Sequence, residues 1–267
     1  MPFDSQKYVA SVFRVSKSSK LAGRWFNGLA FGALAVAAAL ARFAPKASIA
    51  LAGVFTSALA VRWFAQRGLE RLVAMTDRGD VEALRAVPDK WPERFVALVA
   101  LVVFDGTAAV AAIDHTFCGC GEPGCPIDGF DTDLAAVLTA FRGAESGESW
   151  KESAKIVIEA EVDRSGSVVG GSIAALRVTL RNALVRYMLF RSGIPNPLKT
   201  VDDPLRGVVG YGRVLRAPLL FAAASHAKRR GDLPMARELL AKLQPWKPGS
   251  RLAEQRAKLE RTIAVST

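Results

Sequence analysis

The chain has 267 residues, a formal net charge of +11, and 51% hydrophobic residues. This length is enough to bury a core without disulfides or a structural metal, and three cysteines within one short segment exclude the disulfide framework of a small secreted scaffold. The sequence contains no phosphate-binding glycine loop, no G-x-S-x-G elbow and no H-E-x-x-H motif, so it favours a protein without enzymatic activity.

Two uncharged, alanine-rich runs near the N-terminus predict a pair of apolar helices. The first covers 25–41, the second covers 47–61, and Pro45 marks the turn between them. The first run reaches the roughly 17–25 residues that a membrane-spanning helix needs, whereas the second falls short unless Arg62 extends its guanidinium to the head groups. Arginine and tryptophan stand together at both outer ends, where they prefer to lie at a membrane interface. We expect an antiparallel transmembrane hairpin, with two helices buried in a soluble bundle as the alternative.

Two features bear on how this hairpin packs and how it is oriented. Gly28 and Gly32 form a small-x-x-x-small pair, which lets helix backbones approach closely in lipid. The basic segment before the first run favours an N-terminus on the cytoplasmic or equivalent side. We therefore expect these glycines to pack helices and the protein to lie in a bacterial inner membrane or an organelle membrane.

A charged stretch and a third apolar run follow the hairpin. The stretch 66–94 is typical of an exposed helix–turn–helix connector, broken at 78–80 and at Pro88. The run 95–104 is the most hydrophobic of all and stops at Asp105 and Gly106. We expect a helix that ends or kinks there and that packs on the hairpin or dips into the membrane, and the sequence leaves a third span open.

The segment 115–125 holds every cysteine and one of the two histidines. It offers three thiolates and one imidazole, the ligand set of a structural zinc site. Zinc sites, however, usually draw C-x-x-C pairs from two separate arms of the chain, and acidic neighbours would raise the thiol pKa values that redox chemistry needs lowered. We favour an unliganded turn over a zinc site and rank disulfide or redox chemistry and catalysis below both. Zinc, if bound, would be held by His115, Cys118, Cys120 and Cys125.

The clearest amphipathic helix covers 170–193, with apolar residues at helical spacing and with Gly193 and Pro195 at its end. We expect a core-facing stripe with a solvated basic back, and a helix lying on an anionic membrane is the alternative. The arginines of this helix and a basic run further along the chain are the candidate lipid- or partner-binding residues: Arg177, Arg181, Arg186, Lys228, Arg229 and Arg230.

The C-terminal segment 218–261 resembles a single tetratricopeptide repeat followed by the start of another helix. The resemblance covers about a sixth of the chain and is carried by Ala224, Ala227, Gly231, Asp232, Ala236, Leu240, Leu243 and Pro248. It implies at most an interaction surface, because stacked copies are needed to build the superhelical groove of that family. His226 in the first helix is expected to be a half-buried structural residue.

These observations predict an all-α, mostly helical protein in four parts: a basic segment 1–24, a membrane hairpin 25–65, a helical connector with the Cys/His loop 66–148, and a basic helical region 149–267. We expect a membrane-associated scaffold, adaptor or assembly subunit that docks an anionic lipid membrane, a protein partner or further copies of itself. Nucleic acid is disfavoured because no zinc-finger, homeodomain or RNP-type signature accompanies the charge. The alternatives are a pore-forming or membrane-perturbing effector and a metal- or thiol-dependent protein centred on the Cys/His loop.

Overall fold

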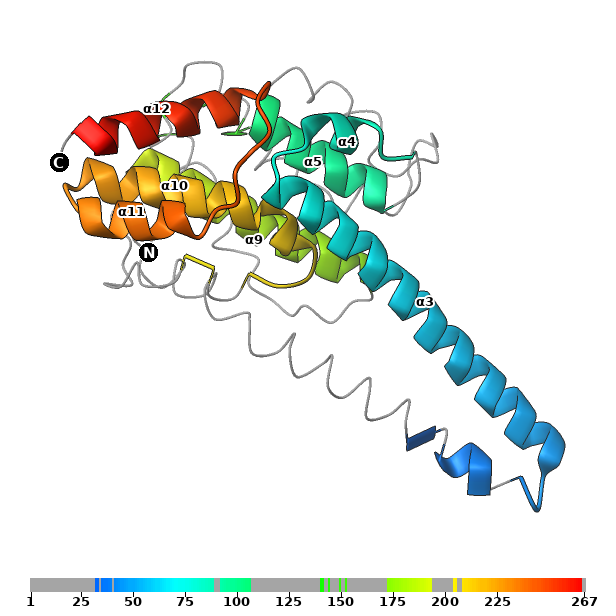
Figure 1. Ribbon diagram of the computed structural model, residues 1–267. Helices are drawn as coiled ribbons and strands as arrows, with labels where there is room; N and C mark the ends of the chain where they lie inside the picture. The colour runs from blue at the N-terminus through cyan, green and yellow to red at the C-terminus, as the bar shows by residue number, and fades with distance from the viewer. Residues whose placement is uncertain are drawn as a thin grey trace.

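The computed structural model describes residues 32–33, 35–39, 41–88, 92–106, 140–141, 144, 149, 152, 172–193, 204–205 and 208–265. Within these ranges every regular element is a helix (Figure 1), which confirms the prediction of a mostly α-helical fold. The elements are α3 (Pro45–Asp77), α4 (Val81–Arg85), α5 (Glu93–Asp105), α9 (Ser172–Ser192), the 3₁₀ helix η3 (Gly210–Leu215), α10 (Arg216–Arg229), α11 (Leu233–Ala241) and α12 (Arg251–Val265). None of the helices in the described part is both long enough and apolar enough to cross a bilayer.

Helix α5 lies at the centre of the core. All ten residues of the apolar run 95–104 are buried, on every side of the helix, as expected of a helix that is hydrophobic all round. The helix ends where the sequence predicted, because Gly106 has a φ of +80°, and Asp105 there forms an ion pair with Arg85 of α4 at 2.7 Å. The run therefore belongs to the protein core, and the expectation that it dips into a membrane is wrong.

The predicted connector is part of the body rather than an exposed linker. The break at 78–80 is confirmed, since α3 ends at Asp77 and Gly79 has a φ of +59°. Two corrections follow from the structure. Helix α3 continues unbroken past residue 65, the predicted end of the hairpin. Helically spaced apolar residues on both sides of the break at 78–80 are buried in the core: Leu69, Leu72, Val73, Val81 and Leu84.

Helix α9 confirms the predicted amphipathic helix and its apolar stripe. The stripe residues whose burial is described are all buried, and Gly193 ends the helix with a φ of +72°. They are Leu176, Leu180, Ala183, Leu184, Tyr187 and Met188. The helix packs against η3, where a Cβ on Gly212 would stand 2.5 Å from the carbonyl oxygen of Thr179. Glycine at this point allows the two elements to approach.

Helices α10 and α11 form the helical pair that the sequence predicted, and α12 lies beside them (Figure 1). The turn between them is built by Gly231, which has a φ of +79°, and by Asp232, whose carboxylate accepts a hydrogen bond from the Met235 N–H at 3.1 Å. Small residues line the contact, with Ala224 and Ala236 fully buried. The body is thus a bundle of helices around α5, α9 and α10.

The segment between α11 and α12 lies against the end of α3. Trp246 packs edge-on against Phe104 of α5 with ring centroids 5.4 Å apart, and its ring centroid lies 5.8 Å from that of Phe221 in α10. A Cβ on Gly79 would stand 2.9 Å from the Cβ and Cγ of Trp246. This tryptophan therefore joins three distant parts of the chain in one apolar contact.

Lys247 ties the same segment to the turn between α3 and α4. Its backbone N–H donates to the carbonyl of Arg78 at 2.9 Å, and its Nζ lies 2.6 Å from the Asp80 carboxylate. The hydrogen bond from Lys247 lowers the pKa of Asp80. The same carboxylate accepts from the Ala83 N–H at 3.2 Å and so caps α4.

Candidate functional site

The first half of α3 leaves the helical body as a projecting arm (Figure 1). The buried core residues of α3 begin at Leu69, so 45–68 lies outside the core and is about 36 Å long. The helical segment 35–39 contacts the start of α3, because the Ser48 hydroxyl donates to the carbonyl of Ala37 at 2.6 Å. This contact brings the end of the first apolar run against the beginning of the second. We call the described residues from 32 to 68 the arm.

The arm carries a concentration of exposed apolar side chains. Of the large hydrophobic residues that are exposed in the described part of the chain, all but Val265 lie in the arm. They are Val36, Phe43, Ile49, Val54 and Trp63, and the exposed fractions of Phe43 and Ile49 reach 87% and 73%. Large apolar patches on a protein surface mark sites of contact with a membrane or another protein. The arm is therefore the candidate functional site.

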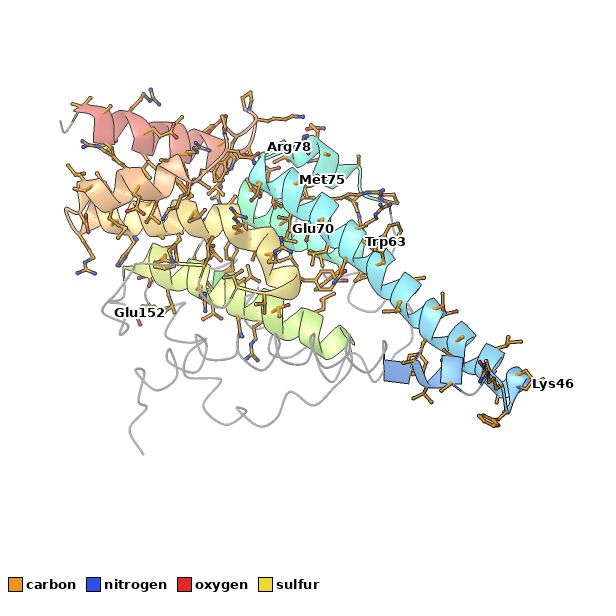
Figure 2. The ribbon with its side chains drawn as sticks, turned by 60° about the horizontal axis from the view of Figure 1, so that its bottom comes forward. Lys46, Trp63, Glu70, Met75, Arg78 and Glu152 are labelled. Atoms are coloured by element: carbon orange, nitrogen blue, oxygen red, sulfur yellow. The ribbon has the colours of Figure 1, made fainter. Side chains whose placement is uncertain are left out.

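Cations flank the apolar part of the arm at both ends. Arg42 and Lys46 are exposed at the turn, and Figure 2 shows Lys46 at the free end of α3 with Trp63 nearer the body. Between Lys46 and Arg62 the sequence of α3 contains no charged residue. An uncharged helical stretch with cations and an aromatic ring at its ends matches the polarity profile of a bilayer, apolar within and charged at the head groups.

The end of the arm nearest the body has an ordered arrangement of charges. The Arg67 guanidinium carbon lies 3.6 Å from the ring centroid of Trp63, and Arg71 is exposed one turn further along. Glu70 binds Arg213 of η3 through both of its carboxylate oxygens, at 2.7 and 3.2 Å. The sequence indicated Arg67 and Arg71 as the basic exit of the hairpin, and Trp63, Arg67 and Arg71 stand at i, i+4 and i+8, the spacing of neighbours on one helix face; it did not indicate the ion pair of Glu70 with Arg213.

One arginine of the basic back predicted for α9 is buried in the protein. The side chain of Arg186 is 1% exposed, and its guanidinium donates to the carbonyl of Pro204 at 3.4 Å. Because a buried guanidinium has no access to a surface, Arg186 is removed from the docking residues. Arg181 is partly buried, and the side chain of Arg177 lies outside the described residues.

The basic run at the end of α10 serves partly to stabilise α9. Arg229 donates a hydrogen bond to the carbonyl of Phe190 in the last turn of that helix, where the unpaired carbonyls and the helix dipole favour a cation. Lys228 is partly buried and Arg230 is exposed. Lys228 and Arg230 remain predicted partner-binding residues, whereas Arg229 has a structural contact.

The remaining predicted site residues are the Cys/His loop and the glycine pair. Gly32 is described, and a Cβ placed on it would meet nothing within 4 Å. In the part of the chain that the structure describes, no group of three or more His, Cys, Asp or Glu could hold a metal ion. The zinc ligands and the other glycine lie outside that part and stay predictions: His115, Cys118, Cys120, Cys125 and Gly28.

No family model, curated protein or solved structure matches this chain. The α10–α11 pair therefore keeps only a local resemblance to a tetratricopeptide unit.

His226 on α10 is more deeply buried than the sequence predicted. Its side chain is 2% exposed and packs against Phe190 with ring centroids 6.0 Å apart. Burial lowers the pKa of His226, Arg229 and Arg230 lower it further, and the Phe190 backbone opposes them. The folded state therefore holds the neutral imidazole, while the unfolded chain takes up a proton below about pH 6.5.

We predict that folding stability is lost as pH falls from about 6.5 through the lower pKa of the folded protein, because the unfolded chain binds the proton more tightly. The His226→Leu variant should show a smaller difference in urea midpoint between about pH 7.5 and about pH 5 than the wild type. His115→Gln is the matched control, because it removes the only other histidine. An acid-induced loss of stability that persists in His226→Leu and disappears in His115→Gln would contradict the prediction, because it would assign the effect to His115.

Proposed function

We propose that the protein is a non-enzymatic, membrane-associated scaffold whose arm inserts into lipid as a hairpin and whose helical body carries the docking surface for a partner. The observation that carries this proposal is the concentration of exposed apolar side chains on a segment that leaves the body. The proposed location is a bacterial inner membrane or an organelle membrane, with the N-terminus on the cytoplasmic or equivalent side.

The free energy of the exposed apolar side chains favours this placement. Moving a fully exposed valine, isoleucine or phenylalanine side chain out of water stabilises it by about 1.5–3 kcal/mol, and the arm exposes several of them. Ser48, which would be costly in hydrocarbon with an unpaired hydroxyl, already donates to the Ala37 carbonyl. The two apolar segments therefore suit lipid better as a pair than either does alone.

The charged residues of the arm are compatible with insertion because they stand at its ends. The rise from Lys46 to Arg62 along the helix is about 24 Å, which is shorter than the roughly 30 Å of the hydrocarbon layer, so Arg62 would have to extend its guanidinium to the head groups. Arg42 and Lys46 have long alkyl stems that can carry their cations to phosphate groups. Trp63 and Arg67 would lie at the head groups on the side of the body.

We propose that the body then presents α11, α12 and the end of α10 to a partner. These helices expose side chains of both signs, including Arg237, Lys258 and Glu260, which is typical of a surface that meets water or a polar partner. The pore-forming alternative draws on Gly28, and the metal- or thiol-dependent alternative draws on the Cys/His loop 115–125. Both stay predictions.

Placing charges in the arm tests the proposal. A variant with both Ile49→Glu and Val54→Glu should lose at least about a hundredfold in binding to phospholipid vesicles in flotation assays, because a charge near a helix centre costs roughly 2.5–3.5 kcal/mol in lipid. Both positions are exposed in the structure, so the fold should be unaffected, with an unchanged circular dichroism spectrum.

The matched control is Ala241→Glu with Ala257→Glu, which adds the same charge at exposed positions of the body. It should float with vesicles like the wild type. Equal flotation of the arm variant and the wild type, or no flotation of the wild type with any vesicle, would contradict the proposal.

A further inference from the structure

We propose that the end of the arm nearest the body binds the phosphate head groups of anionic phospholipids through Arg67 and Arg71, with Trp63 at the membrane interface. This inference rests on the proposed membrane insertion and adds to it a lipid class and the residues that select it. It places a lipid contact on α3, in addition to the docking residues that the sequence predicted on α9 and α10.

The first support is the geometry of Trp63 and Arg67. The guanidinium carbon lies 3.6 Å from the ring centroid, so Arg67 stacks on the indole. Stacking uses the face of the guanidinium and leaves its N–H edge to donate hydrogen bonds, and the planar fork of arginine matches phosphate oxygens. The contact also restrains a long side chain before it meets a ligand, which reduces the entropy that binding costs.

The second support is the local balance of charge. Glu70, the carboxylate on the same stretch of helix, is held by Arg213 from η3 at 2.7 Å. The charge of Glu70 is thus neutralised by Arg213. Glu70 therefore does not neutralise the positive charges of Arg67 and Arg71. The side chain of Glu93 in α5 lies beside Gly68 of α3, at a partly buried position. Arg67 and Arg71, in contrast, are exposed to solvent. This face therefore attracts anions.

The third support is the position of the two arginines along α3. They follow directly on the exposed apolar part of the arm, and the core residues of the body begin at Leu69. A phospholipid has the complementary arrangement, since its hydrocarbon chains would contact the apolar part of the arm and its phosphate would contact the arginines. A free phosphate ion offers no apolar partner, and an acidic protein surface offers no apolar layer of about 30 Å. An anionic lipid is therefore the ligand that matches the whole segment.

The test compares flotation of the full-length protein with vesicles of phosphatidylcholine alone and with vesicles that also contain about 30 mol% phosphatidylglycerol. We expect the wild type to bind the anionic vesicles more tightly. Arg67→Gln should reduce that binding about fivefold, and Arg67→Gln with Arg71→Gln about 25-fold, with little change for phosphatidylcholine alone. Added inorganic phosphate at the same ionic strength should not compete.

The control is Lys258→Gln with Arg261→Gln, which removes the same net charge from α12, away from the arm (Figure 1). It should retain tight binding to the anionic vesicles. Wild-type binding that is equal for both vesicles, an equal loss in the control, or competition by inorganic phosphate would overturn the head-group site while leaving insertion of the arm intact. Failure to bind either vesicle would overturn the proposed function itself.

Discussion

The Phe104→Ala variant is expected to lose about 3–5 kcal/mol of unfolding free energy, the cost of removing a large aromatic side chain from a packed core. Phe104 is fully buried at the end of α5, and its ring contacts Trp246. Since domains of this kind are stable by about 5–15 kcal/mol, the loss is a large fraction of the total. The measurement is the midpoint of urea unfolding followed by circular dichroism.

Phe43→Ala is the matched control for this substitution. The side chain is 87% exposed at the turn of the arm, so the same chemical change should alter the unfolding free energy in solution by no more than about 0.5 kcal/mol. Similar losses for the two variants would mean that α5 is not the centre of the core.

The Gly79→Ala variant is expected to lose about 2–5 kcal/mol, from two separate causes. Gly79 has a φ of +59°, and an L-residue with a Cβ in this left-handed region costs roughly 1–2 kcal/mol. The added Cβ would also stand 2.9 Å from Trp246, and overpacking of this kind costs about 1–3 kcal/mol. The readout is again the urea midpoint at constant slope.

Gly231→Ala separates these two causes. Gly231 has a φ of +79°, but a Cβ there would meet nothing within 4 Å. Only the backbone cost of about 1–2 kcal/mol applies. If both variants lose the same free energy, the proposed contact between Gly79 and Trp246 contributes nothing to stability.

The helical body was predictable from the sequence where the signal was local. The apolar spacing in 170–193, the stop at Gly106 and the turn at Gly231 and Asp232 all depend on residues within a few positions of one another. The continuity of α3 was not predictable in the same way. Arg62 and Trp63 resemble the end of a membrane helix, yet helical spacing continues to Leu69 and Leu72, and these residues join a core that only the folded chain assembles.

The apolar part of the candidate site and its basic end at Arg67 and Arg71 were predictable from the sequence, whereas the contacts that the fold makes with the charged residues were not. The apolar runs mark the arm directly, but a sequence of basic residues does not reveal which of them the fold covers. Arg186 is buried because the opposite side of α9 is also packed. Arg213 pairs with Glu70 across 143 positions of the chain, and no local pattern indicates such a contact. Charge counting alone therefore included Arg186, which the fold buries, among the exposed docking residues.

Amide hydrogen exchange of the full-length protein, with and without anionic vesicles, tests insertion of the arm most directly. In plain buffer the exposed arm should exchange faster than α5, whose apolar run is wholly buried. We predict that vesicles slow exchange across 47–61 strongly and leave α5 and α10 unchanged, because hydrocarbon excludes the water that exchange requires. Exchange of 47–61 at the same rate with and without vesicles that bind the protein would contradict the account.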